Sequence, residues 1–131
     1  MKRYKAENRV VTVEIEQPGL YVFEKESAIG KTFLCRILKR CRSYGERTDA
    51  YTYTDLTAGR SLMHYLMTTD LDLVMLDRYD MYNDKFEQDI KEIAQKAIVL
   101  IDCKNDSNLT EDAQLCFLTL QEEQLLLEVD T

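Results

Sequence analysis

Residues 20–38 read LYVFEKESAIGKTFLCRIL, and this stretch decides the fold. It begins with a short apolar run from Leu20 to Phe23, which is typical of a buried strand. A polar loop follows, and from Thr32 onward apolar residues recur at helical spacing. The stretch therefore predicts a strand, a loop and a helix in direct succession.

The residues at the junction of loop and helix indicate what this succession can bind. Backbone N–H groups of such a loop can surround a phosphate, and the N-terminus of the helix faces the anion. A lysine at this position reaches the terminal phosphates, and a Ser or Thr hydroxyl beside it can ligate Mg²⁺. We expect the nucleotide contacts to come from Ser27, Ala28, Ile29, Gly30, Lys31, Thr32 and Phe33.

A second informative stretch runs from Leu71 to Asp77. Its continuous apolar run, Leu73 to Leu76, suits a strand of a parallel sheet that is buried on both faces. Ligands of such sheets bind at the carboxyl ends of the strands. Asp77 should therefore arrive near the phosphate loop, where its carboxylate can hold Mg²⁺ directly or through water.

The pairing of these two stretches resembles the Walker A and Walker B motifs of P-loop nucleotide hydrolases. The chain as a whole is similar to small ABC-like and AAA-like ATPase cores. The resemblance implies that ATP and Mg²⁺ are the cofactors, that Lys31 and Asp77 are the catalytic residues, and that Thr32 and Asp77 hold the metal. One position departs from the motif, because Lys25 stands where the first glycine is expected.

Periodicity along the chain predicts a single domain, residues 1–131, of the α/β class. We expect a three-layer, P-loop NTPase-like fold with a mainly parallel sheet, helices on both faces, and flanking N- and C-terminal β-hairpins. The N-terminal hairpin would join Arg9–Glu16 to Leu20–Phe23. Further strands are expected over 49–54, 71–77, 97–102, 115–119 and 125–129, with helices from 32 to a glycine cap at 45, over 60–68 and over 84–97.

Three functions compete on this sequence. The first is a slow ATPase or nucleotide-dependent switch, slow because Arg78 follows Asp77 where ABC-type ATPases carry a glutamate. The second is a nucleoside or nucleotide kinase, because Asp77-Arg78-Tyr79 is similar to the Asp-Arg-Tyr of thymidylate kinases. The third is a degenerate, non-hydrolysing module that acts through protein contacts, which Lys25 favours.

The resemblance also implies residues that could complete the site. In many P-loop hydrolases, the strand after Walker B ends in a polar residue that senses the γ-phosphate, and here Asp102, Lys104 or Asn105 could do so. Many such ATPases also take an arginine from a neighbouring molecule, so we expect a protein partner or self-association. The candidate arginines are Arg47, Arg60 and Arg78.

Composition limits the remaining possibilities. A net charge of −7 disfavours nucleic-acid binding, which needs an excess of Lys and Arg. No apolar run approaches the roughly 20 residues that span a bilayer, and no secretory signal is seen at the N-terminus. We therefore expect a cytoplasmic protein whose four scattered cysteines are free thiols.

Overall fold

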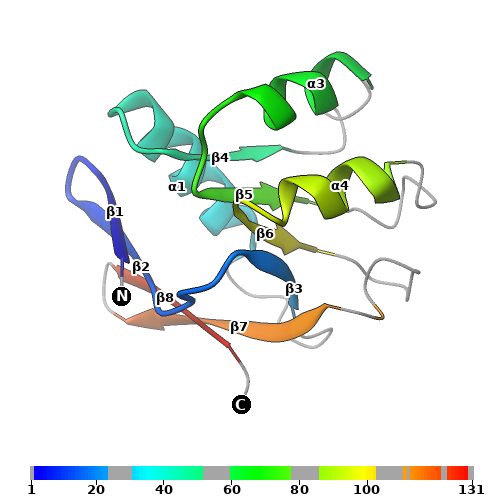
Figure 1. The fold of residues 1–131 in the computed structure, drawn as a ribbon. Coiled ribbons are helices and arrows are strands. Elements are labelled where there is room, and N and C mark those ends of the chain that lie inside the picture. Colours follow the sequence, from blue (N-terminus) through cyan, green and yellow to red (C-terminus); the bar gives the residue numbers. More distant parts are fainter. Residues whose placement is uncertain are drawn as a thin grey trace.

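The computed structural model describes residues 2–23, 31–51, 60–77, 86–102, 111, 113–121 and 124–129. Within them, one sheet has the strand order β1-β2-β8-β7-β3-β6-β5-β4 (Figure 1). The strands are β1 (Lys2–Ala6), β2 (Arg9–Val13), β3 (Gly19–Phe23), β4 (Thr48–Tyr51), β5 (Leu73–Leu76), β6 (Ile98–Ile101), β7 (Gln114–Gln121) and β8 (Gln124–Val129). The helices are α1 (Lys31–Ser43), α3 (Arg60–Thr68) and α4 (Glu87–Ile93).

Five neighbouring strands, in the order β7-β3-β6-β5-β4, run parallel to one another. The continuous apolar runs of β5 and β6 are buried at every position, as expected for strands covered on both faces. Helices connect β3 to β4, β4 to β5, and β5 to β6. The prediction of an α/β fold with a mainly parallel sheet is confirmed.

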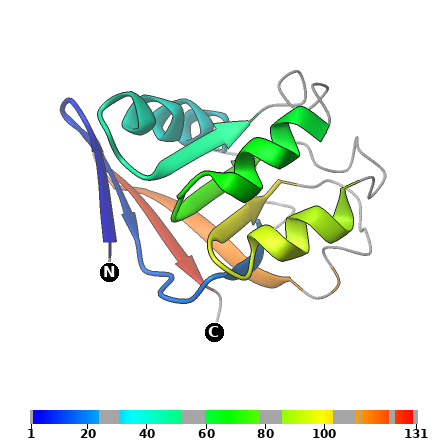
Figure 2. The same cartoon turned by 45° about the horizontal axis from the view of Figure 1, so that its top comes forward.

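Alternating side chains of these strands pack into two separate hydrophobic cores, one on each face of the sheet. Tyr21 and Met75 belong to a cluster that also contains the buried face of α1. Val74 and Val99 belong to a second cluster that contains buried residues of α3 and α4. Figure 2 shows the corresponding layers, with α1 on one side of the sheet and α3 and α4 on the other. Helices therefore cover both faces of the parallel strands.

Helix α1 ends where the sequence predicts a glycine cap. Gly45 has a φ of 88°, which a glycine adopts without steric cost. Its N–H donates to the carbonyl of Arg42 (3.0 Å), and the N–H of Glu46 donates to the carbonyl of Cys41 (3.1 Å). This pair of bonds is the Schellman arrangement, which satisfies carbonyls at the end of the helix.

The predicted N-terminal hairpin is wrong in its pairing. β2 does form within Arg9–Glu16, but it pairs antiparallel with β1 and parallel with β8. Both edges of β3 are occupied by β6 and β7, so β3 has no edge left for β2. The hairpin at the N-terminus therefore consists of β1 and β2, and β1 is a strand that the sequence did not predict.

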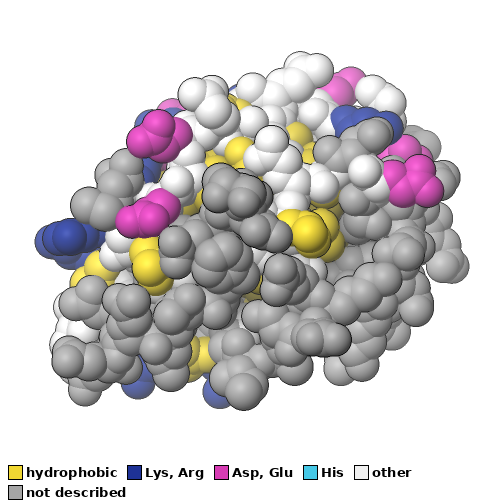
Figure 3. Space-filling view, turned by 90° about the horizontal axis from the view of Figure 1, so that it is seen from below, with side chains coloured by type: hydrophobic (Ala, Val, Ile, Leu, Met, Phe, Trp, Pro, Cys, Tyr) yellow, Lys and Arg dark blue, Asp and Glu magenta, His cyan; other side chains and the backbone are white. Residues whose placement is uncertain are grey.

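The predicted C-terminal hairpin is confirmed. β7 and β8 pair antiparallel, with Gln121 opposite Gln124. The hairpin extends the sheet beyond the part that α3 and α4 cover, at the bottom of Figure 1. Leu115 of β7 is 45% exposed. Figure 3 views the molecule from this lower side, where described apolar side chains reach the surface in several separate places.

The helix boundaries agree with the sequence to different degrees. α3 spans the predicted residues 60–68. α4 is shorter than predicted and begins at Glu87, while residues 84 and 85 lie outside the described residues. Residues 52–54 of the strand predicted over 49–54 also lie outside them. No helix of the described part is long and apolar enough to span a bilayer.

A truncation in the middle of the parallel sheet should be far more costly than one at its surface. Leu100 of β6 is completely buried, so Leu100→Ala should lower the free energy of unfolding by about 2–5 kcal/mol. Leu115→Ala is the matched control and should cost about 1 kcal/mol or less. Urea denaturation measures both values, and equal losses would contradict the described packing.

None of the described cysteines, which are Cys35, Cys41 and Cys116, forms a disulfide bond, as predicted. Burial, helped by the nearby Glu46 carboxylate, raises the pKa of the Cys41 thiol to about 11. The folded state therefore binds this proton more tightly than the unfolded chain does. The resulting stability is complete below about pH 8.5 and is lost as the pH rises toward 11.

Cys41→Ala should accordingly flatten the dependence of unfolding free energy on pH between about pH 8.5 and 10, where a normal thiol titrates. Denaturation curves of both proteins at several pH values measure this slope. An unchanged slope would show that the Cys41 thiol titrates normally in the folded protein.

Candidate functional site

Lys31 is the central residue of the candidate site. It is the first residue of α1, and β3 ends at Phe23. A strand therefore precedes residues 24–30 and a helix follows them, as the sequence predicts. Lys31 is only 9% exposed, and no other Lys, Arg, Asp or Glu of the described residues is as buried. Its Nζ lies 5.7 Å from the centre of the Phe23 ring. An aromatic face attracts a cation at this distance, so the end of β3 helps to hold the ammonium group.

The ammonium group forms an ion pair with a carboxylate from the neighbouring strand. Lys31 Nζ donates to Asp102 Oδ1 at 2.9 Å, and the two side chains are 11% and 17% exposed. Asp102 directly follows β6, which lies between β3 and β5 in the sheet. A charge-assisted bond at this depth offsets part of the cost of removing both groups from water.

Asp77 stands beside Asp102 at the same edge of the sheet. Leu76 and Ile101 are paired in register, so Asp77 and Asp102 follow side by side on adjacent strands about 4.8 Å apart. Backbone bonds fix this alignment, because the N–H of Asp102 donates to the carbonyl of Leu76 (3.0 Å). The sequence therefore placed Asp77 correctly, at the carboxyl end of a buried parallel strand.

The first turn of α1 presents polar and cationic groups at this edge. Thr32 is exposed and Phe33 is half-buried. The guanidinium of Arg9, from the start of β2, lies 4.9 Å from the centre of the Phe33 ring. The first turn contains no acidic residue, and the first N–H groups of a helix have no partner within the helix. This turn is therefore suited to an anion.

Tyr51 is the last residue of β4, the strand at the other side of β5 from β6. Its carbonyl accepts the N–H of Asp77 (2.9 Å), and its hydroxyl donates to Asp49 Oδ2 (2.9 Å). Burial, followed by the Asp49 carboxylate, raises the pKa of the Tyr51 phenol above its usual value. Tyr51 therefore remains neutral and hydrogen-bonded at neutral pH.

The donor set at this edge fits a magnesium ion. The two carboxylates and the exposed hydroxyl of Thr32 are oxygen ligands, which Mg²⁺ prefers. The described residues hold no group of three or more His, Cys, Asp or Glu side chains that could bind a metal by themselves. Mg²⁺ commonly takes only one or two carboxylates and completes its shell with phosphate oxygens and water. The residues therefore suit a metal that arrives with a phosphate.

Several predicted residues lie outside the described residues, so their place in the site is untested. These are the loop residues Ser27, Ala28, Ile29 and Gly30 with Lys25, the residues Arg78 and Tyr79, and the candidate sensors Lys104 and Asn105. Arg60 begins α3, and nothing is described of its side chain. Arg47 lies before β4, at the amino ends of the strands, where it pairs with Asp70 and Asp72.

Two cavities lie at the amino ends of the strands, away from Lys31. They have volumes of about 390 and 480 Å³, and both are lined by Ile15, Glu16 and Pro18. Lysines at the first cavity are already bound: Lys2 pairs with Asp72, and Lys96 donates to the carbonyl of Met67 (2.6 Å). Neither cavity includes Lys31, Asp77 or Asp102, so we place the candidate site at the carboxyl ends of the parallel strands instead.

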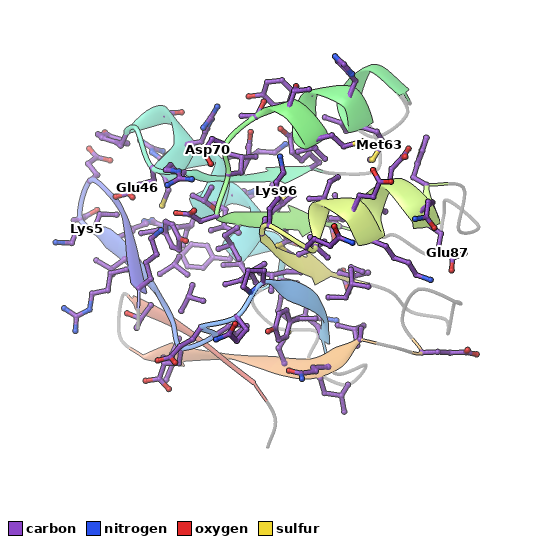
Figure 4. The ribbon with its side chains drawn as sticks, in the orientation of Figure 1. Lys5, Glu46, Met63, Asp70, Glu87 and Lys96 are labelled. Carbon is purple, nitrogen blue, oxygen red and sulfur yellow. The ribbon has the colours of Figure 1, made fainter. Side chains whose placement is uncertain are left out.

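Figure 4 shows the side chains in the orientation of Figure 1. The N–H of Lys5 in β1 donates to Glu46 Oε1 (3.4 Å), so the first hairpin is tied to the turn after α1. Met63 lies between α3 and α4 on the other layer. The bond between Lys5 and Glu46 and the packing of Met63 therefore serve the fold.

Sequence reasoning missed the partner of Lys31. It named Asp102 as one of three residues that could sense a phosphate, and it named Lys31 as a phosphate ligand. The contact between them depends on β6 lying next to β3, which no local pattern reveals. The positions of Arg9 and Phe23 near the first turn of α1 were missed for the same reason.

No family model, curated protein or solved structure matches this chain. We therefore derive a function from the residues at the carboxyl ends of the parallel strands alone.

A double-mutant cycle should show strong coupling between Lys31 and Asp102. Removing one partner of a buried pair leaves the other charge uncompensated, so the stability losses of Lys31→Met and Asp102→Asn should sum to more than the loss in the double mutant. We expect a coupling energy of about 1–3 kcal/mol. The exposed pair of Arg40 and Glu7 (3.2 Å) is the control and should give about 0–1 kcal/mol. Equal coupling in the two pairs would contradict the burial of the Lys31 pair.

Proposed function

We propose that the chain is a P-loop nucleotide-binding domain that binds ATP with Mg²⁺ and acts as a slow ATPase or a nucleotide-dependent switch. One observation carries the proposal: a buried lysine opens the helix after a central parallel strand and meets a carboxylate from the adjacent strand. Lysine is rarely this buried, and a perturbed or buried charge at the carboxyl edge of an α/β sheet is a mark of a ligand site.

Each residue would have a distinct role in this site. Lys31 would contact the β- and γ-phosphates, and the amides at the start of α1 would contact phosphate oxygens. Thr32 and Asp77 would hold Mg²⁺, which neutralises charge on the phosphates when it is bound. Phosphoryl transfer of this kind depends mainly on positioning and electrostatic stabilisation, and these groups can supply both.

Slow turnover follows from the residues around Asp77. Arg78 occupies the next position, and an arginine cannot act as a base that orients the attacking water. In the free protein, Asp102 is already engaged by Lys31. We therefore propose that the domain holds its nucleotide for long periods, in the cytoplasm, and that a protein partner or a second copy completes the site.

No observation favours the kinase alternative, because Arg78 and Tyr79 lie outside the described residues. Release of ADP from ATP at equal rates with and without nucleosides or nucleoside monophosphates would exclude it.

Mg²⁺ and ATP should raise the melting temperature of the protein. A ligand that binds only the folded state stabilises it by about 2.7 kcal/mol at a concentration 100 times its Kd, which corresponds to a shift of several degrees. Lys31→Ala should abolish the shift, whereas Lys5→Ala, which removes an exposed lysine of β1, should leave it intact. Differential scanning fluorimetry measures all three proteins. If millimolar Mg²⁺ and ATP leave the wild-type melting temperature unchanged, the proposal fails.

A further inference from the structure

We propose that Asp102 makes this site selective for polyphosphates that carry a divalent cation, by competing with metal-free anions for Lys31. The inference rests on the proposed function and assigns a specificity to the same site. It starts from the ion pair of 2.9 Å between Lys31 and Asp102, in which both side chains are mostly buried.

The ion pair leaves Lys31 without spare charge in the free protein. Its ammonium group is held between the Asp102 carboxylate and the face of the Phe23 ring. An incoming phosphate oxygen must therefore share or replace Asp102 as the partner of Lys31. Replacement would leave a carboxylate with little access to water, next to another negative charge, which is strongly unfavourable.

Asp77 strengthens this effect. It follows Asp102 in register on the adjacent strand, about 4.8 Å away along the sheet. The charges of Lys31, Asp77 and Asp102 sum to −1, and the Arg9 guanidinium near Phe33 brings the described charges of this edge to zero. A metal-free polyphosphate adds several negative charges to it, and burial weakens the screening by water.

A divalent cation reverses this balance. A bound Mg²⁺ would add two positive charges to the same groups, which would then attract the polyanion. Asp102 can then keep its bond to Lys31 or turn toward the metal shell, because neither arrangement leaves a charge without a partner. Lys31 thus becomes available to phosphate only when the metal is present.

Asp102→Asn is the variant that tests this selectivity. The asparagine has the same shape, and its amide oxygen can still accept from Lys31. Isothermal titration calorimetry with inorganic pyrophosphate and with ATP, each in EDTA and in Mg²⁺, gives the affinities. We expect metal-free pyrophosphate to bind the variant about tenfold or more tightly than wild type, because a full charge in contact with the ligand site is removed.

Two matched variants complete the design. Asp102→Glu keeps the charge and should keep the wild-type preference for metal-bound ligands. Asp89→Asn removes a negative charge from α4, on the opposite face of the sheet, and should bind all ligands as the wild type does. Circular dichroism checks the folding of each variant, and Asp102→Ser replaces Asp102→Asn if the latter does not fold.

The outcomes separate this inference from the proposed function. If wild type binds ATP with Mg²⁺ but neutral variants at position 102 gain no affinity for metal-free pyrophosphate beyond that of Asp89→Asn, the inference is overturned and the function stands. If wild type binds metal-free pyrophosphate as tightly as the magnesium complex, the inference is also overturned. If wild type does not bind ATP with Mg²⁺, both fail.

Discussion

The ion pair between Lys31 and Asp102 is the interaction on which the proposed site depends. It joins the first residue of α1, the helix that follows β3, to the residue after β6, the strand next to β3 in the sheet. Both partners are withdrawn from most of the solvent, so each is tolerated only because the other is present. A charge pair with this cost is a poor device for stability alone, which is why its position at a sheet edge suggests a ligand.

The strand order is what makes the pair possible. β6 lies between β3 and β5, so Asp102 is closer than Asp77 to the start of α1. The acid that the sequence motif marks as a metal ligand is one strand further away, in register with Asp102. Lys31, after β3, and a metal at Asp77, after β5, would therefore act on one polyphosphate from the two sides of β6, whose end carries Asp102.

Much of this fold could be predicted from local sequence. β5 and β6 are continuous apolar runs of four residues, each followed by an aspartate. Such runs indicate a buried parallel strand. The glycine cap of α1 and the span of α3 were predicted because caps and helical periodicity are local signals.

The pairing of strands is a long-range property, and there prediction failed. The sequence indicated a hairpin of two strands with a turn at Pro18. However, β3 pairs with β6 along one edge and with β7 along the other. β1 was not predicted because three of its five residues are charged, although its Tyr4 and Ala6 are buried against α1. The contact between Lys31 and Asp102 depends on the same long-range pairing, so local sequence could not reveal it.

The most direct test is a crystal structure of the protein with Mg²⁺ and a non-hydrolysable ATP analogue. The account predicts that Lys31 Nζ lies within hydrogen-bonding distance of phosphate oxygens, with the metal beside Asp77 and Thr32. A nucleotide bound elsewhere, or a Lys31 that still contacts only Asp102 while the nucleotide is present, would contradict it.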